Sequence, residues 1–182
     1  MLRAARLAVL VILCAASARA APPRWRLRAS LLQGFGGGRA ADDSIAARFP
    51  TTIDLGARLW GPLSLAATVT STLAGELDGS CGRALRPNAI AGALGLRADL
   101  ANGRSAPWVD PWVEAHAGVG AEAGVHAQPG GGATAATFAA AGARAGIDVW
   151  LGKAAVTVAV AFDYLPLGAT ASFVLGASFV LF

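Results

Sequence analysis

Along most of the chain, apolar residues alternate with polar or small residues at a period of two. Between positions 63 and 70, leucine, alanine and valine occupy the odd positions, and serine, alanine and threonine occupy the even ones. Successive side chains of a strand point to opposite sides, so this alternation gives one apolar and one polar face. The pattern predicts eight strands, at 24–35, 49–59, 63–73, 89–100, 109–123, 137–149, 155–164 and 171–182.

The connections between the predicted strands differ in length in a regular way. Those at 60–62, near Asn102-Gly103 and at 151–153 are short, whereas 36–48, 74–87 and 124–136 are long; the last, 165–170, is short again. Transmembrane β-barrels have short periplasmic turns and longer outer loops. A tilted strand of about ten residues also spans roughly 23 to 25 Å, the height of their apolar band. Both observations favour a barrel with its two termini in the periplasm.

Residues 1–20 have the features of a cleavable signal peptide. Arg3 and Arg6 precede an apolar stretch, and Ala18-Arg19-Ala20 provides a cleavage pattern. We therefore expect a signal peptide at 1–20 and one barrel domain at 21–182. Cleavage removes three of the fifteen basic residues and none of the eleven acidic ones, so the net charge falls from +4 to +1. This small charge gives no reason to expect nucleic acid as a partner.

The composition changes this interpretation little. Hydrophobic residues make up 55% of the chain, but no apolar run after residue 20 is long enough for a membrane helix. The 23 glycines also favour strands and turns. We expect the glycine triplets at 36–38 and 130–132 to form flexible outer loops. Cleavage leaves Cys81 as the remaining cysteine, and the sequence does not indicate its role.

Aromatic residues give a further test of the topology. Most of them are predicted to lie near the two ends of the strands, as in the aromatic girdles of membrane barrels. Four of them share the parity of the polar face, so they should point inward unless a turn or bulge reorients them: Trp60, Phe138, Trp108 and Trp150.

With these patterns, the chain resembles the small eight-stranded outer-membrane barrels, a group that includes the OmpA membrane domain, OmpX and OmpW. The last predicted strand ends on Phe182, with Val180 and Val174 at alternate positions. This segment resembles the carboxy-terminal signal that the barrel-assembly machinery recognises. The resemblance implies an all-β, closed, up-and-down antiparallel transmembrane barrel.

The resemblance also implies where the protein is and what it meets. We expect it in the outer membrane of a Gram-negative bacterium, exported through the periplasm as a monomer. Its partners would be outer-membrane lipid and lipopolysaccharide, and, during biogenesis, periplasmic chaperones and the barrel-assembly machinery.

Charged residues of both signs share the polar face and are expected to point into the lumen. An eight-stranded barrel is only just wide enough for its own side chains, so we favour an ion-pair network that fills the interior. A narrow ion pathway or gate is the alternative. The predicted network consists of Arg26, Arg28, Asp54, Arg58, Arg97, Asp99, Asp110, Glu114, His116, Arg144 and Asp148.

Little in the sequence indicates catalysis. Glu114 and His116 lie two positions apart on one strand face, which is half of a hydrolytic constellation. Outer-membrane lipid A deacylases use His, Ser and Glu, but Gly118 and Gln128 stand two positions after the two histidines. Two histidines and one cysteine at unrelated spacings make no metal-ligand set. We therefore expect a protein that is not an enzyme, with no cofactor and no metal.

Three functions remain open on the sequence. The favoured one is a scaffold whose outer loops bind at the cell surface. A small-solute channel or carrier is the second. The third is a secreted soluble barrel, similar to a lipocalin, that binds an apolar ligand and therefore turns its apolar face inward.

Overall fold

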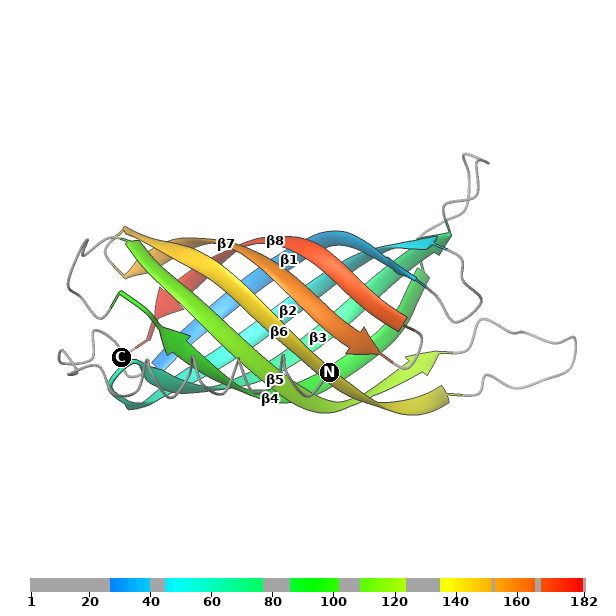
Figure 1. The fold of residues 1–182 in the computed structure, drawn as a ribbon, viewed down its shortest axis with the longest axis horizontal. Coiled ribbons are helices and arrows are strands. Elements are labelled where there is room, and N and C mark those ends of the chain that lie inside the picture. Colours follow the sequence, from blue (N-terminus) through cyan, green and yellow to red (C-terminus); the bar gives the residue numbers. More distant parts are fainter. Residues whose placement is uncertain are drawn as a thin grey trace, which may run out of the picture.

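The structure is a computed structural model that describes residues 27–39, 45–76, 86–101, 109–123, 135–151, 153–165 and 168–181. It confirms the eight antiparallel strands, which close into a single barrel because β1 pairs with β8 (Figure 1). The strands are β1 (Leu27–Arg39), β2 (Ile45–Trp60), β3 (Leu63–Glu76), β4 (Arg86–Asp99), β5 (Val109–Ala123), β6 (Ala135–Leu151), β7 (Ala154–Leu165) and β8 (Gly168–Val180). The predicted signal peptide, Cys81 and the glycine triplet 130–132 lie outside the described residues.

The period-two alternation sorts side chains between the outside and the inside of the barrel. On β3, Leu65 and Val69 are exposed, whereas Ser64, Ala66 and Thr68 are buried. Every other strand also carries large apolar side chains on its exposed face. So large an exposed apolar surface is not sustained in water and marks contact with a membrane or partner. A lipocalin-like barrel needs the reverse arrangement, so that alternative is wrong.

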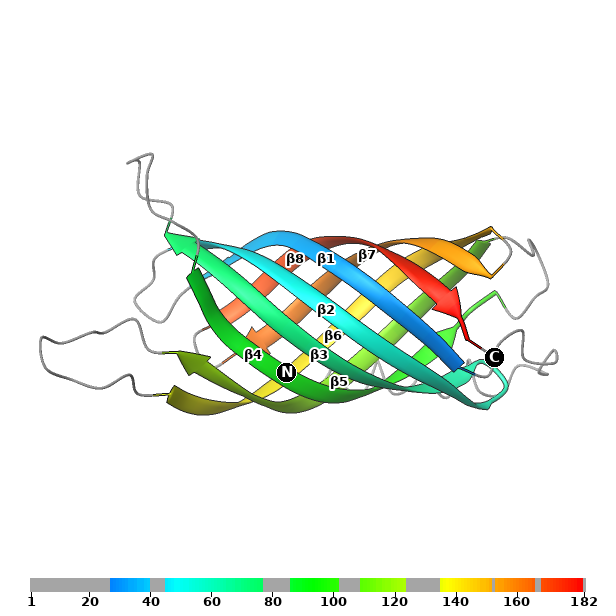
Figure 2. The ribbon, with the colours of Figure 1, turned by 180° about the vertical axis from the view of Figure 1, so that it is seen from behind.

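Two of the three connections between strands at one end of the barrel have two residues each. At this end, which we call the turn end, β2 turns into β3 at Gly61 and Pro62, and β6 reaches β7 within two residues. Strand β1 also begins here and β8 ends here, since the amide of Leu181 donates to the carbonyl of Leu27 at 2.9 Å. The opposite end is the loop end, where β1 connects to β2 and β5 to β6 (Figures 1 and 2). The turn end is the one that the sequence predicts to be periplasmic.

Several connections differ in length from those predicted. The triplet Gly36 to Gly38, expected in a loop, belongs to β1 and pairs with both β2 and β8. A Cβ at Gly36 would collide with the Ala171 carbonyl oxygen and lie 2.6 Å from the Ser172 Cα. Glycine is therefore required here by the close approach of β8, and the β1–β2 connection shrinks to residues 40–44. The β3–β4 connection shrinks to 77–85, and the β4–β5 connection, 100–108, is longer than predicted.

The four aromatic residues with inward parity have different outcomes. A β-bulge between Arg58 and Trp60 breaks the alternation, and Trp60 points outward with 64% of its surface exposed. Trp150 is buried, and Phe138 contributes to an internal cavity. Trp108 lies outside the described residues. Trp60 is therefore a residue whose direction is set by a bulge and not by the alternation.

Within the described ranges, no helix has the length and hydropathy needed to cross a bilayer.

Candidate functional site

The barrel interior contains a dense group of polar side chains near the turn end. Its centre is Asp148 on β6, which is completely buried. The Asp148 carboxylate accepts hydrogen bonds from Arg97 at 2.6 Å, Thr157 at 2.7 Å, Trp112 at 3.1 Å and Arg28 at 3.4 Å. These donors come from β4, β7, β5 and β1. One carboxylate thus connects five strands across the lumen.

A second layer of charges surrounds this centre. Asp99 accepts from the Arg97 Nε at 2.7 Å and from Arg58 at 2.9 Å, and Arg28 lies 3.7 Å from Asp54. The Arg97 guanidinium also stacks over the Trp112 ring, 4.3 Å from its centroid. We call this group the plug: Arg28, Asp54, Arg58, Arg97, Asp99, Trp112, Asp148 and Thr157. Paired and hydrogen-bonded charges are the form in which buried charge is tolerated.

The plug leaves almost no accessible surface at its level of the lumen. Arg28, Asp54, Arg97, Asp99, Trp112 and Asp148 each have at most 2% of their surface exposed. Apolar side chains of β1, β7 and β8 pack beside Trp112 in a buried cluster formed by Leu32, Ala159, Ala161 and Val174. The described side chains of the plug therefore block the lumen at this level.

Glycines on β6 make room for the large side chains of β5. Trp112 is in register with Gly146, and His116 with Gly142. A Cβ at Gly146 would lie 2.8 Å from the Trp112 ring, and one at Gly142 would lie 2.6 Å from the His116 ring. A large inward residue thus faces a glycine across the ladder, which is how the narrow lumen accepts a tryptophan.

A middle layer lies between the plug and the loop end. Arg144 forms an ion pair with Glu114, and the His116 ring lies between two carboxylates. Its Nε2 is 2.9 Å from Asp163, and its Nδ1 is 3.5 Å from Glu114. Because both ring nitrogens face carboxylates, neither is directed at a hydroxyl that it would activate as a general base. The histidine–carboxylate pair therefore lacks the geometry of a hydrolase.

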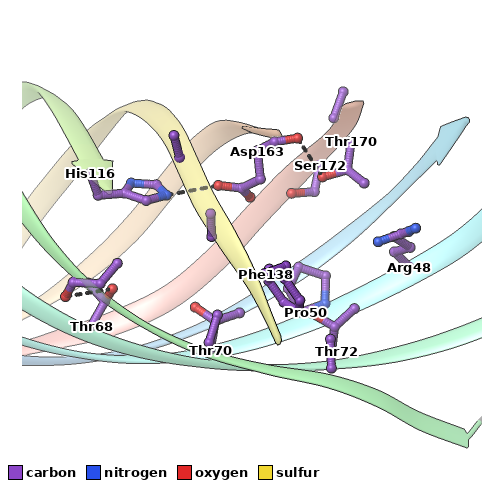
Figure 3. Close-up of a pocket in the computed structure, with 16 residues that line it drawn as sticks. Arg48, Pro50, Thr68, Thr70, Thr72, His116, Phe138, Asp163, Thr170 and Ser172 are labelled. Carbon is purple, nitrogen blue, oxygen red and sulfur yellow. Dashed lines mark hydrogen bonds and ion pairs between the residues drawn. The ribbon is translucent and has the colours of Figure 1, made fainter. Parts of the chain in front are cut away.

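A cavity of about 60 Å³ occupies the lumen on the loop-end side of His116 (Figure 3). Strands β3 and β8 line it with threonine and serine hydroxyls, and β4 and β6 line it with alanines and the Phe138 ring. A smaller cavity of about 30 Å³ extends to Arg144 and shares His116 and Asp163 with the first. These two cavities both lie on the loop-end side of the plug.

The predicted network residues are brought together, with one exception. Arg26 lies outside the described residues. The interior contains Arg28, Asp54, Arg58, Arg97, Asp99, Asp110, Glu114, His116, Arg144 and Asp148. Asp110, which is buried, is in register with Asp148. Whether this network is structural or gating remains a prediction.

The interior also contains residues that the predicted network leaves out. Trp112 and Thr157 contact Asp148, Asp163 pairs with His116, and Ser30 and Ser178 share a hydrogen bond of 2.9 Å across the β1–β8 seam. The alternation places Ser30, Thr157 and Asp163 on the polar face of their strands. Trp112 shares the parity of Asp110 and Glu114, which could have identified it, whereas β8 has no charged residue to give the parity of Ser178.

The two described residues of the predicted assembly signal lie on the inward face of β8. Val174 is buried, and Val180 packs against Trp150 and Ala155 inside the barrel. Phe182 lies outside the described residues. The outward face of the strand, whose direction the sequence did not give, presents Phe173, Leu175, Phe179 and Leu181. Recognition of this segment by assembly factors remains a prediction.

Among the residues that the structure describes, no cluster of three or more His, Cys, Asp or Glu side chains is arranged to hold a metal ion.

Comparisons with known proteins agree on the fold. No protein-family model matches the chain, and no curated protein matches its sequence. The structure is similar to that of Neisserial surface protein A, with a TM-score of 0.65, 12% identity and coverage of 85% of this chain and 97% of the other. It is also similar to the N-terminal β-barrel domain of Pseudomonas aeruginosa OprF, with a TM-score of 0.50, 15% identity and coverage of 83% and 96%. The chain therefore has the fold of the small eight-stranded outer-membrane β-barrels.

Proposed function

We propose that the protein is a non-enzymatic integral protein of the outer membrane of a Gram-negative bacterium. Its barrel is a scaffold, and binding takes place at the loop end through the segments that connect the strands there. The protein reaches the membrane through the periplasm. The observation that carries this proposal is the combination of an outward apolar face with a plug that blocks the lumen near the turn end.

The outward face supports a membrane location. Every described strand carries large apolar side chains on the outside, among them Leu31, Ile53, Leu94, Val119 and Phe162. A closed barrel pairs the backbone groups of all its strands, so it has no open edge to expose to lipid. Water would be an unfavourable solvent for this surface, and the hydrocarbon of a bilayer a favourable one.

The plug supports a scaffold in preference to a channel. An ion that crosses the barrel would have to pass the layer of Asp148, Arg97 and Trp112, whose side chains have almost no exposed surface. Opening a path would separate buried ion pairs, and an uncompensated buried charge costs about 3 to 5 kcal/mol. We therefore expect the resting barrel not to conduct.

The first experiment tests the membrane location. The protein is expressed with its amino-terminal segment, the envelope is fractionated, and the outer-membrane fraction is run on gels with and without boiling. A folded barrel should stay in that fraction and migrate differently when unboiled. Recovery in the soluble periplasm or the medium would contradict the proposal, as would the absence of a heat-dependent shift.

The second experiment distinguishes the scaffold from the channel. Planar-bilayer recordings of the purified barrel should be silent, whereas an Arg97→Ala, Trp112→Ala double variant should give discrete conductance because it removes the plug's largest side chains. An Ala117→Ser variant, changed on the outward face, is the control and should remain silent. Steady conductance by the unchanged protein would favour the channel.

A further inference from the structure

The lining of the loop-end cavity combines two kinds of chemistry. Hydroxyls come from β3 and β8, contributed by Thr68, Thr70, Thr72, Thr170 and Ser172. Apolar surface comes from alanines of β4 and β6 and from Phe138, whose ring points into the cavity (Figure 3). This mixed lining suits a ligand that carries hydroxyls and also has an apolar face.

The charges of the cavity disfavour a charged ligand. Asp163 lies next to His116, and 29% of its side-chain surface is exposed, so its carboxylate is accessible from the cavity. Arg48 lies on the opposite side from His116, toward the loop end (Figure 3). A ligand of net negative charge would be repelled by Asp163, and a ligand of net positive charge by Arg48. An uncharged polar ligand avoids both repulsions, and its hydroxyls can donate to Asp163 and accept from arginine.

The size of the cavity limits the ligand to one small ring. A water molecule needs roughly 10 to 15 Å³ on the measure that gives about 60 Å³ here, so the space holds about four to six waters. Drug-sized ligands occupy pockets several times larger. The smaller cavity below it, next to Arg144, adds about 30 Å³.

We propose that this cavity binds a single uncharged sugar ring that enters from the loop end. The sugar hydroxyls face β3 and β8, one hydroxyl donates to the Asp163 carboxylate, and the apolar C–H face of the ring packs on Phe138. The same chemistry is offered by a free monosaccharide and by the terminal sugar of a surface glycan. This site goes beyond the proposed scaffold function. It requires a folded barrel, but it does not require the connecting segments at the loop end to bind anything.

Ligand-observed saturation-transfer NMR tests the proposal on the full-length protein refolded in detergent micelles. The probes are glucose and galactose, each as the free sugar and as the methyl glycoside, with the acetate anion and the glycine zwitterion as comparators. We expect saturable binding of at least one sugar. Binding of free sugar and methyl glycoside alike would indicate a site open to glycan termini, and binding of the free sugar alone a monosaccharide site.

Two variants locate the binding in the cavity. Ala91→Phe fills it from β4 and should weaken sugar binding at least tenfold, whereas Ala117→Phe puts the same ring on the exposed outer face of β5 and should leave binding unchanged. Thr72→Val removes one hydroxyl with little change of volume and should weaken binding about threefold. This conservative variant keeps the test decisive if Ala91→Phe does not fold.

A heat-dependent gel shift, measured on every sample, separates the two proposals. Loss of the shift in the unchanged protein would contradict the barrel itself. With the shift intact, the cavity proposal is overturned by any of three results: no sugar binds, sugar binding survives Ala91→Phe, or glycine or acetate binds as well as the sugars do.

Discussion

The turn-end and loop-end halves of the barrel interior are built on the same strands but filled differently. Near the turn end, inward positions carry long charged side chains and Trp112, and they form the plug. Near the loop end, inward positions carry alanine, threonine and serine, and a cavity remains. The width of an eight-stranded barrel is fixed by its strand number and stagger. Side-chain volume and charge alone therefore decide whether a given level of the lumen is closed.

The largest effect is expected from the centre of the plug. Asp148→Ala removes the acceptor shared by Arg97, Arg28, Trp112 and Thr157 and leaves buried guanidinium groups without it. The free energy of unfolding, measured by urea titration in micelles, should fall by about 3 to 5 kcal/mol. Asp163→Ala, at the partly exposed contact with His116 on the loop-end side of the plug, should cost less than about 1 kcal/mol. If the two variants lost equal unfolding free energy, the buried carboxylate of the plug would contribute no more to stability than the partly exposed one.

Removing one hydroxyl from each half of the interior gives a finer comparison of their stability. The buried Thr157 donates to the Asp148 carboxylate at 2.7 Å and also contacts Ser178 at 3.0 Å. Hydrogen bonds to charged groups contribute about 1.5 to 3 kcal/mol, so Thr157→Val should destabilise by that amount in the same titration. Thr70→Val breaks the 2.9 Å contact with Thr52 beside the cavity and should cost about 0.5 to 1.5 kcal/mol. The comparison fails if Thr70→Val is the more costly change.

Glycine substitutions measure how tightly the plug is packed, with an outward-facing glycine as the reference. A Cβ at Gly146 would lie between 2.6 and 2.8 Å from Ala159, Val158 and Trp112, whereas one at Gly92, on the exposed outer face of β4, would have the Thr68 carbonyl at 3.9 Å as its nearest neighbour. Gly146→Ala should cost about 1 to 3 kcal/mol of unfolding free energy, and Gly92→Ala should be neutral or slightly stabilising. A neutral Gly146→Ala would mean that Trp112 moves readily, and the plug would then be looser than its contacts indicate.

The sequence predicts the face that each residue occupies better than it predicts the partner of that residue. A period of two places Arg97 and Asp148 on the inside, but which side chains meet depends on the register between strands. The pairing of Trp112 with Gly146 follows from the β5–β6 ladder, and nothing in the alternation specifies that ladder. The contact between Asp163 and His116 likewise joins residues 47 positions apart.

Two local departures from the period-two pattern have a physical cause as well, one at the loop end and one at the turn end. Gly36 to Gly38 lack side chains, so they carry no hydropathy signal and look like a loop, although the close approach of β8 is what requires glycine there. Trp60 has a side chain with a clear hydropathy, but the bulge that turns it outward leaves no mark in the period-two pattern.

The position of Asp148 has a consequence for how the barrel folds. Its donor Arg28 is 120 residues away along the chain, and the seam contact between Ser30 and Ser178 spans 148 residues. Contacts between distant residues form slowly, because a long segment of chain must be ordered before they contribute. The first strand therefore cannot complete its buried contacts until the last strand has been inserted. Until then Arg28 and Asp148 lie in a lumen that is open along one side. Water that enters through the unclosed seam would solvate these charges during insertion. Closure of the barrel would be the step that removes this water.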